Sequence, residues 1–143
     1  MTYIWLNIVP ILAATVAGFA AGAAWYAGLS GAWMTAAGLT RERIDRESNA
    51  STYAIAFVAE FWIACILAGA LILAPPEAGE WTMAFGTAIV IWIGFVLPTI
   101  VVNHRFGLRP WSLTLIDAGH WLLVFLVQAT VLRLFPLVAP ASA

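Results

Sequence analysis

The sequence is poor in charge and in cysteine, and each scarcity excludes a class of protein. Only 9% of its 143 residues are charged, and all six basic residues are arginine, so there is no lysine. With a net charge of -1 and arginines this scattered, we expect no nucleic-acid partner and no polybasic lipid-binding cluster. The single cysteine, Cys65, excludes a disulfide within the chain, and its apolar surroundings favour a role as a small apolar filler.

Hydrophobic residues, in contrast, make up 64% of the chain. Soluble domains are about half apolar and about one quarter charged. A chain of this length is expected to fold as one domain, residues 1–143. Small domains bury proportionally less of their surface, so a water-soluble core would leave much of this apolar surface exposed. We therefore expect the lipid bilayer to be the solvent of this protein.

Four apolar runs are long enough to cross a bilayer: residues 3–29, 53–74, 81–102 and 113–132. A spanning helix needs about 20 such residues. The runs are continuous rather than alternating, which favours helices over the strands of a barrel. The first run lacks the basic start of a signal peptide and is too long for one, so we expect it to be retained. The predicted fold is all-α, an integral membrane bundle of four transmembrane helices arranged as two hairpins.

The connections predict how the chain is oriented. The loops at residues 30–52 and 103–112 carry five arginines, and the opposite side carries only Arg133. By the positive-inside rule these two loops face the cytoplasm and both termini lie outside. The first loop is predicted to hold a short interfacial or cytoplasmic helix, because Arg41, Glu42 and Arg43 each have an opposite charge four residues later.

Two features inside the runs bear on helix packing. Ala14, Gly18 and Gly22 form a stripe of small residues in the first run, which lets another helix approach closely. Packing within the chain and self-association through this stripe both remain open. Pro98 removes the hydrogen bond to the carbonyl of Gly94 and is predicted to kink the third helix.

Three ionisable residues lie inside the predicted spans: Glu60 in the second, and Asp117 and His120 in the fourth. At about 1.5 Å per residue they lie roughly 6–11 Å below the cytoplasmic surface. A charge in hydrocarbon costs about 3 kcal/mol even on the gentler insertion scales, so such side chains face the bundle interior and find partners. Further members of the stripe, and nearby candidate partners, are Thr114, Val124, Gln128, Asn103, His104, Arg105 and Arg109.

This intramembrane polar cluster allows several interpretations. It is a structural clasp if Glu60 pairs with His120 or an arginine, and Asp117 with Arg109. It is a path for protons, ions or a small solute if acid and imidazole groups at one depth form a relay. A metal or haem site and an intramembrane hydrolase are further readings, but the chain has no HxxxH or ExxH spacing and no nucleophile beside a base. We therefore expect no enzymatic activity, no catalytic residue, no cofactor and no bound metal.

Several short segments resemble the DUF1761 family of small membrane proteins. In the first half they are Trp25-Tyr26, Gly31-Ala32-Trp33-Met34 and Gly38-Leu39. In the second half the similarity runs from Trp92-Ile93-Gly94-Phe95 through Asn103, Phe106 and Arg109 to Ile116-Asp117-Ala118-Gly119-His120, although an aromatic residue is expected where His120 stands. The resemblance implies a four-helix protein of the bacterial inner membrane and assigns no activity.

Two functions fit these observations. The first is a non-enzymatic structural or accessory subunit, acting as a homo-oligomer or within a larger membrane complex, because the loops are too short for a water-soluble site. The alternative is a small transporter or channel for protons, ions or a solute, in which Glu60, Asp117 and His120 line the path. Four helices rarely enclose a pore alone, so the alternative requires an oligomer.

Overall fold

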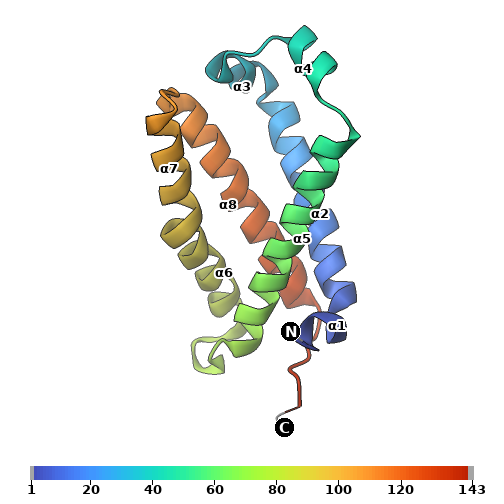
Figure 1. Cartoon of the computed structure of the whole chain (residues 1–143). Coiled ribbons are helices and arrows are strands. Elements are labelled where there is room, and N and C mark those ends of the chain that lie inside the picture. Colours follow the sequence, from blue (N-terminus) through green and yellow to red (C-terminus); the bar gives the residue numbers. More distant parts are fainter. Residues whose placement is uncertain (1, 142–143) are drawn as a thin grey trace.

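A computed structural model describes residues 2–141, and helices make up nearly all of this part of the chain (Figure 1). The elements are α1 (Thr2–Leu6), α2 (Ile8–Gly28), α3 (Ser30–Ala37), α4 (Arg41–Glu47), α5 (Ala50–Leu73), the 3-10 turn η1 (Pro76–Ala78), α6 (Glu80–Ile91), the π-helical turn η2 (Trp92–Val96), α7 (Leu97–Phe106) and α8 (Trp111–Leu134). Four helices are long and apolar enough to cross a membrane: α2, α5, the continuous helix Glu80–Phe106 and α8. The predicted all-α fold with four spans is confirmed.

The first span begins at Ile8, five residues later than the start of the apolar run. Asn7 interrupts the helix there with φ -118° and ψ 23°, which separates α1 from α2. Its side chain instead donates to the carbonyl of Tyr3 and exchanges two 2.8 Å hydrogen bonds with the backbone of Val138. Apolarity alone could not locate this break, because it depends on a partner 131 residues away.

The third span contains the irregularity that Pro98 predicts, but the deviation lies one turn earlier. Residues Trp92–Val96 form a π-helical turn in which the N–H of Leu97 donates to the carbonyl of Trp92. Proline lacks the N–H that would continue the α-helical pattern. A π-helical turn just before the proline lets the helix pass this residue and continue as α7 to Phe106.

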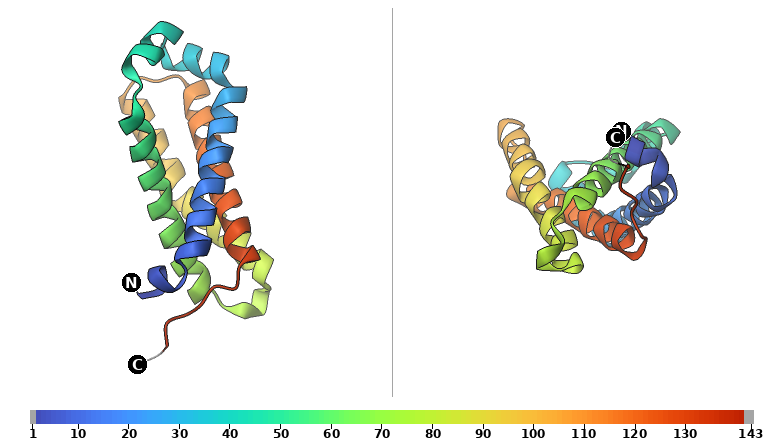
Figure 2. Two further views of the ribbon diagram at one scale, coloured as in Figure 1. Left: turned by 90° about the vertical axis from the view of Figure 1, so that its right-hand side faces the viewer. Right: turned by 90° about the horizontal axis from the view of Figure 1, so that it is seen from below.

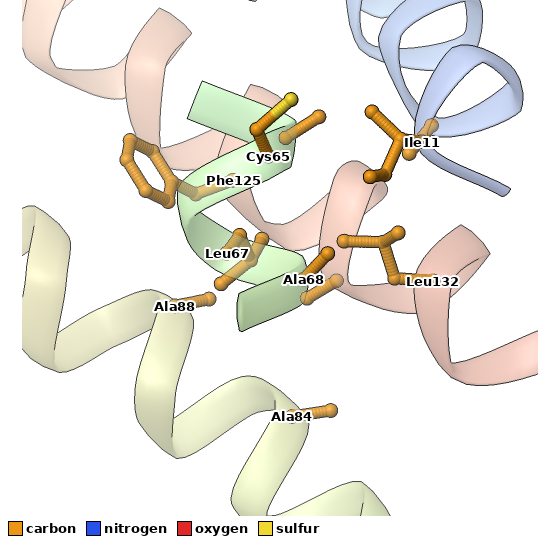
Figure 3. Close-up of a cluster of buried hydrophobic side chains, with 11 residues drawn as sticks. Ile11, Cys65, Leu67, Ala68, Ala84, Ala88, Phe125 and Leu132 are labelled. Atoms are coloured by element: carbon orange, nitrogen blue, oxygen red, sulfur yellow. The ribbon is translucent and has the colours of Figure 1, made fainter. Parts of the chain in front are cut away.

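The core forms where α2, α5, α6 and α8 meet, and α8 packs most extensively against α2 and α6. The fully or almost fully buried side chains at this crossing include Ile11, Cys65, Leu67, Phe125 and Leu132 (Figure 3). Small residues occupy the closest approaches, among them Ala68 on α5 and Ala84 and Ala88 on α6. Tight packing of this kind holds membrane helices together, because lipid offers no hydrophobic drive between them.

The two ends of the bundle differ in charge. The segments α3 and α4 lie at the same end as the turn between α7 and α8, and both termini lie at the other end beside η1 (Figures 1 and 2). We call these the α4 end and the terminal end. The five arginines of the two long loops lie at the α4 end. Arg133 lies toward the terminal end, where it forms an ion pair with Glu80.

Two short helices, rather than one, connect α2 to α5. Gly38 ends α3 in the left-handed conformation with φ 69°, which a glycine adopts without steric cost. The hydroxyl of Thr40 then accepts a hydrogen bond from the N–H of Arg43 and begins α4. Two of the expected charge pairs form, Arg41 with Asp45 at 3.7 Å and Arg43 with Glu47 at 3.2 Å. Arg46 pairs with the neighbouring Glu47, not with the residue four positions before it.

Candidate functional site

Glu60 reaches from α5 to the glycine face of α2 and is only 3% exposed. A Cβ atom built on Gly18 would lie 2.8 Å from Oε2 of this carboxylate, and one on Gly22 would lie 3.7 Å from Oε1. Ala14, Gly18 and Gly22 are themselves buried inside the chain. The small-residue stripe therefore makes room for a carboxylate within one chain, which answers the question of packing that the sequence left open.

His120 enters the same space from α8. A Cβ atom built on Gly22 would lie 2.6 Å from its Nε2 atom, so only glycine fits at this position without a shift. The imidazole lies between two aromatic rings, with centroid distances of 4.7 Å to Tyr26 and 5.0 Å to Trp121. Glu60 and His120 lie at similar positions on their helices, about 14–15 Å along the axis from the first residues of α5 and α8.

Three buried polar atoms around this glycine face have no hydrogen-bond partner in the described part of the chain. They are Oε2 of Glu60, Oε1 of Gln128 and Nδ1 of His120. Gln128 does donate from Nε2 to the backbone carbonyl of Glu60, at 3.2 Å. An unpaired buried polar group costs about 1–3 kcal/mol, more if it is charged. The fold therefore maintains an unsatisfied polar pocket at its centre.

A cavity of about 740 Å³ connects this pocket to the α4 end. It lies between α2 and α5, below α3 and α4, with Glu60 and His120 at its inner end. Most of its wall is apolar or aromatic, and its lining includes Phe19, Gly22, Tyr26, Trp33, Met34, Arg41, Tyr53, Ala56, Ala59 and Trp121. Toward the terminal end the interior holds fully buried residues of the core, among them Ala64 and Leu67.

Asp117 belongs to a second polar group, closer to the α4 end. The hydroxyl of Tyr26 donates to Oδ1 at 2.9 Å, and Nε2 of His104 lies 3.6 Å from Oδ2. The clasp suggested by the sequence is thus wrong in its partners: Asp117 pairs with His104, not Arg109, and in the described residues Glu60 forms no ion pair. Tyr26 joins the two groups, because its ring also contacts His120.

The remaining predicted residues tie helix ends together. Nδ1 of His104 and the guanidinium of Arg105 both contact the hydroxyl of Thr114, at 3.1 and 2.8 Å. The Arg105 guanidinium also lies 3.9 Å above the ring of Trp111. Arg109 donates to the carbonyl of Ala37 at 3.2 Å, and thereby links the α7–α8 turn to α3. Asn103 is exposed and lies outside both polar groups.

Two indole N–H groups hold α8 in place around Asp117. Trp25 donates to the carbonyl of Ile116 at 3.1 Å, and Trp92 donates to the carbonyl of Ala118 at 2.9 Å. The ring of Trp25 leaves no space for a side chain at Gly119, where a Cβ atom would lie 2.8 Å from it. These contacts fix the register of α8 against α2 and against the third span.

The donor set does not resemble a metal centre. Within residues 2–141 no three His, Cys, Asp or Glu side chains lie close enough together to hold an ion. Asp117 and His104 form one acid–imidazole pair, and Glu60 and His120 lie in the other polar group.

A comparison with known protein families identifies the family to which the chain belongs. The family described as "Protein of unknown function (DUF1761)" matches residues 9–133, which is most of the sequence. The chain belongs to the DUF1761 family. No curated protein and no solved structure matches it. Three aromatic residues of the segments that resemble DUF1761, Trp25, Tyr26 and Trp92, all donate hydrogen bonds to the α8 turn that contains Asp117.

The sequence analysis missed the central role of Tyr26, which appears there only in the Trp25-Tyr26 segment that resembles the DUF1761 family. A signal was present, since Tyr26 lies on the same face of α2 as Gly22 and Gly18, which are four and eight residues earlier. The cavity itself left no signal in the sequence. It depends on how α2 and α5 cross, and on the position of α3 and α4 above them.

Proposed function

We propose that this DUF1761 protein is a small, non-enzymatic transporter that binds a solute or proton at Glu60. The observation that carries the proposal is the cavity of about 740 Å³ that reaches from the α4 end to the buried Glu60 and His120. A purely structural clasp needs its polar groups paired and sealed. Among the described residues the Oε2 atom of Glu60 has no partner, and Glu60 lines the cavity.

The asymmetry of the interior supports transport rather than a continuous channel. The lining of the cavity extends from Glu60 to Arg41 and Ile44 at the α4 end, whereas buried core residues such as Leu67 lie between Glu60 and the terminal end. Alternating access requires a binding site that is open to one side at a time. A second state, open toward the terminal end, is part of this proposal.

The proposed location is the bacterial inner membrane, with the α4 end in the cytoplasm and both termini in the periplasm. The support is the segregation of five arginines at the α4 end. The cavity then opens to the cytoplasm. We further propose that the protein acts as a homo-oligomer, because four helices alone rarely enclose a polar path across the membrane.

Reconstituted vesicles with a pH-sensitive dye inside test the proposal. An imposed pH gradient is followed with and without a panel of small organic cations, anions and neutral solutes. We expect a protein-dependent flux in at least one condition, lost in Glu60→Gln and retained in Glu77→Gln, which removes an exposed loop carboxylate. The proposal is wrong if no condition gives such a flux, or if Glu60→Gln behaves as the wild type.

A second candidate is an accessory subunit of a larger membrane complex. Its support is the third span, of which only Ala84 and Ala88 are buried. Phe85, Ile93 and Phe95 on this helix point outward. Mass measurement after gentle solubilisation separates the candidates. A co-purifying partner chain favours the accessory role, and a monomer without partners contradicts it.

A further inference from the structure

We propose that the ligand of the cavity is a small organic cation with an apolar body, whose charge binds the Glu60 carboxylate. This inference rests on the proposed function and names the class of solute. Three properties of the cavity support it: the acidic side chain at its inner end, the aromatic wall and the size.

The acidic group at the inner end of the cavity is the Glu60 carboxyl. Glu60 is the only acidic residue in the lining, it is only 3% exposed, and its Oε2 atom has no hydrogen-bond donor among the described residues. The only lysine or arginine in the lining is Arg41, which belongs to α4 at the mouth. Its guanidinium already lies 3.7 Å from the carboxylate of Asp45. Glu60 forms no ion pair within the described residues, and its Oε1 atom lies toward Gly22 in the cavity lining, where a ligand cation provides a partner.

The wall between the mouth and Glu60 is rich in aromatic rings. Tyr26, Trp33, Tyr53 and Trp121 all line the cavity. The faces of such rings attract cations, tryptophan most strongly, and pockets of this type bind quaternary ammonium groups. The aliphatic part of the wall accommodates an apolar body, which a metal ion or a sugar does not offer.

The volume also favours an organic molecule over a bare ion. Binding pockets for small molecules usually measure about 300–1,000 Å³ and are mostly apolar with a few polar groups. At about 740 Å³ the cavity falls within that range. Inorganic ions would leave most of this space, and nearly all of its apolar wall, without contact.

Two probe ions of the same shape and opposite charge test the inference. The full-length protein is placed in nanodiscs of neutral lipid, and equilibrium dialysis measures the binding of tetraphenylphosphonium and of tetraphenylborate. We expect saturable binding of the cation only. Glu60→Gln should weaken it at least tenfold, whereas Glu77→Gln should leave it unchanged. Equal binding of both probes, no saturable binding, or wild-type binding by Glu60→Gln would overturn the inference.

A second pair of variants covers the case in which Glu60→Gln does not fold. Tyr53→Leu removes a half-exposed ring from the cavity wall, and Trp5→Leu removes an exposed ring outside it. The loss of one cation–ring contact corresponds to roughly 2- to 30-fold in affinity. We expect that weakening for Tyr53→Leu and none for Trp5→Leu. Equal affinities of these two variants contradict the inference.

Different results would contradict the transport proposal and the organic-cation proposal. If vesicles show Glu60-dependent flux only with protons, anions or neutral solutes, transport stands and the organic cation is wrong. If the cation binds at Glu60 but no flux is observed, the ligand class stands and transport is wrong.

Discussion

The substitution Gly22→Ala tests whether the glycine face of α2 is shaped by the polar groups opposite it. The new Cβ atom would lie 2.6 Å from Nε2 of His120, where ordinary contacts begin near 3.4 Å, so one of the two must move by about 0.8 Å. His120 lies between the rings of Tyr26 and Trp121 and is 7% exposed, which limits its movement.

The expected change in folding stability on Gly22→Ala results from two opposing effects. Alanine is favoured over glycine inside a helix by about 1 kcal/mol. Overpacking a well-filled interior costs about 1–3 kcal/mol. Gly86→Ala is the matched control, because Gly86 lies within α6 and a Cβ atom there would meet nothing within 4 Å. We expect Gly22→Ala to be less stable than Gly86→Ala by about 1–3 kcal/mol.

The only cysteine of the chain supplies the assay. Cys65 is fully buried, so a dye that fluoresces on reaction with a thiol reports unfolding in detergent. The unfolding midpoint of Gly22→Ala should lie below that of the wild type, and that of Gly86→Ala at or above it. A Gly22→Ala midpoint equal to or higher than that of the control would refute the packing described for α2, α5 and α8.

Three further predictions concern the termini, the Asp117 group and the topology. Asn7→Ala loses the paired hydrogen bonds to the C-terminal backbone and should lower the free energy of unfolding by about 1–3 kcal/mol in the same assay. In a double-mutant cycle, Tyr26→Phe and Asp117→Ala should show a coupling of about 1 kcal/mol, because Tyr26→Phe removes the donor and Asp117→Ala the acceptor of the same hydrogen bond. Cysteines placed singly at Asp45 and Glu77 should react with impermeant reagents from opposite sides of the membrane, position 77 from the periplasm.

Each of these has a control or a contradicting outcome. Asn103 is exposed at the end of α7, so Asn103→Ala should leave the unfolding midpoint unchanged, unlike the variant at position 7. Additive effects at Tyr26 and Asp117 would mean that their hydrogen bond contributes nothing. Labelling of both loop cysteines from one side would contradict the four-span topology.

The spans were predictable from the sequence because bilayer thickness and backbone hydrogen bonding leave a long apolar run few alternatives. A local signal also located the disturbance of the third span near Pro98, because proline lacks the N–H that an α-helix requires. Break points that depend on distant partners were not predictable. Asn7 is the example, since its partner lies in the C-terminal segment.

The sequence predicted which polar residues face the interior, but not which of them contact one another. The cost of burying Glu60, Asp117 and His120 predicts that they face the interior, and each is buried or partly buried. The choice of partner depends on helix crossing and on side-chain rotamers. The sequence suggested Arg109 as the partner of Asp117. The crossing of α2, α7 and α8 instead places Tyr26 and His104 against the Asp117 carboxylate.

The central claim is that a cavity open at the α4 end reaches the level of Glu60, and thiol accessibility tests it most directly. Ala59 lines the cavity, whereas its neighbour Val58 is 64% exposed on the outer surface of α5, where lipid is expected. In a Cys65→Ala background, an impermeant cationic thiol reagent added from the α4 side should label Ala59→Cys and not Val58→Cys. No labelling of Ala59→Cys, or equal labelling of both positions, would contradict the claim.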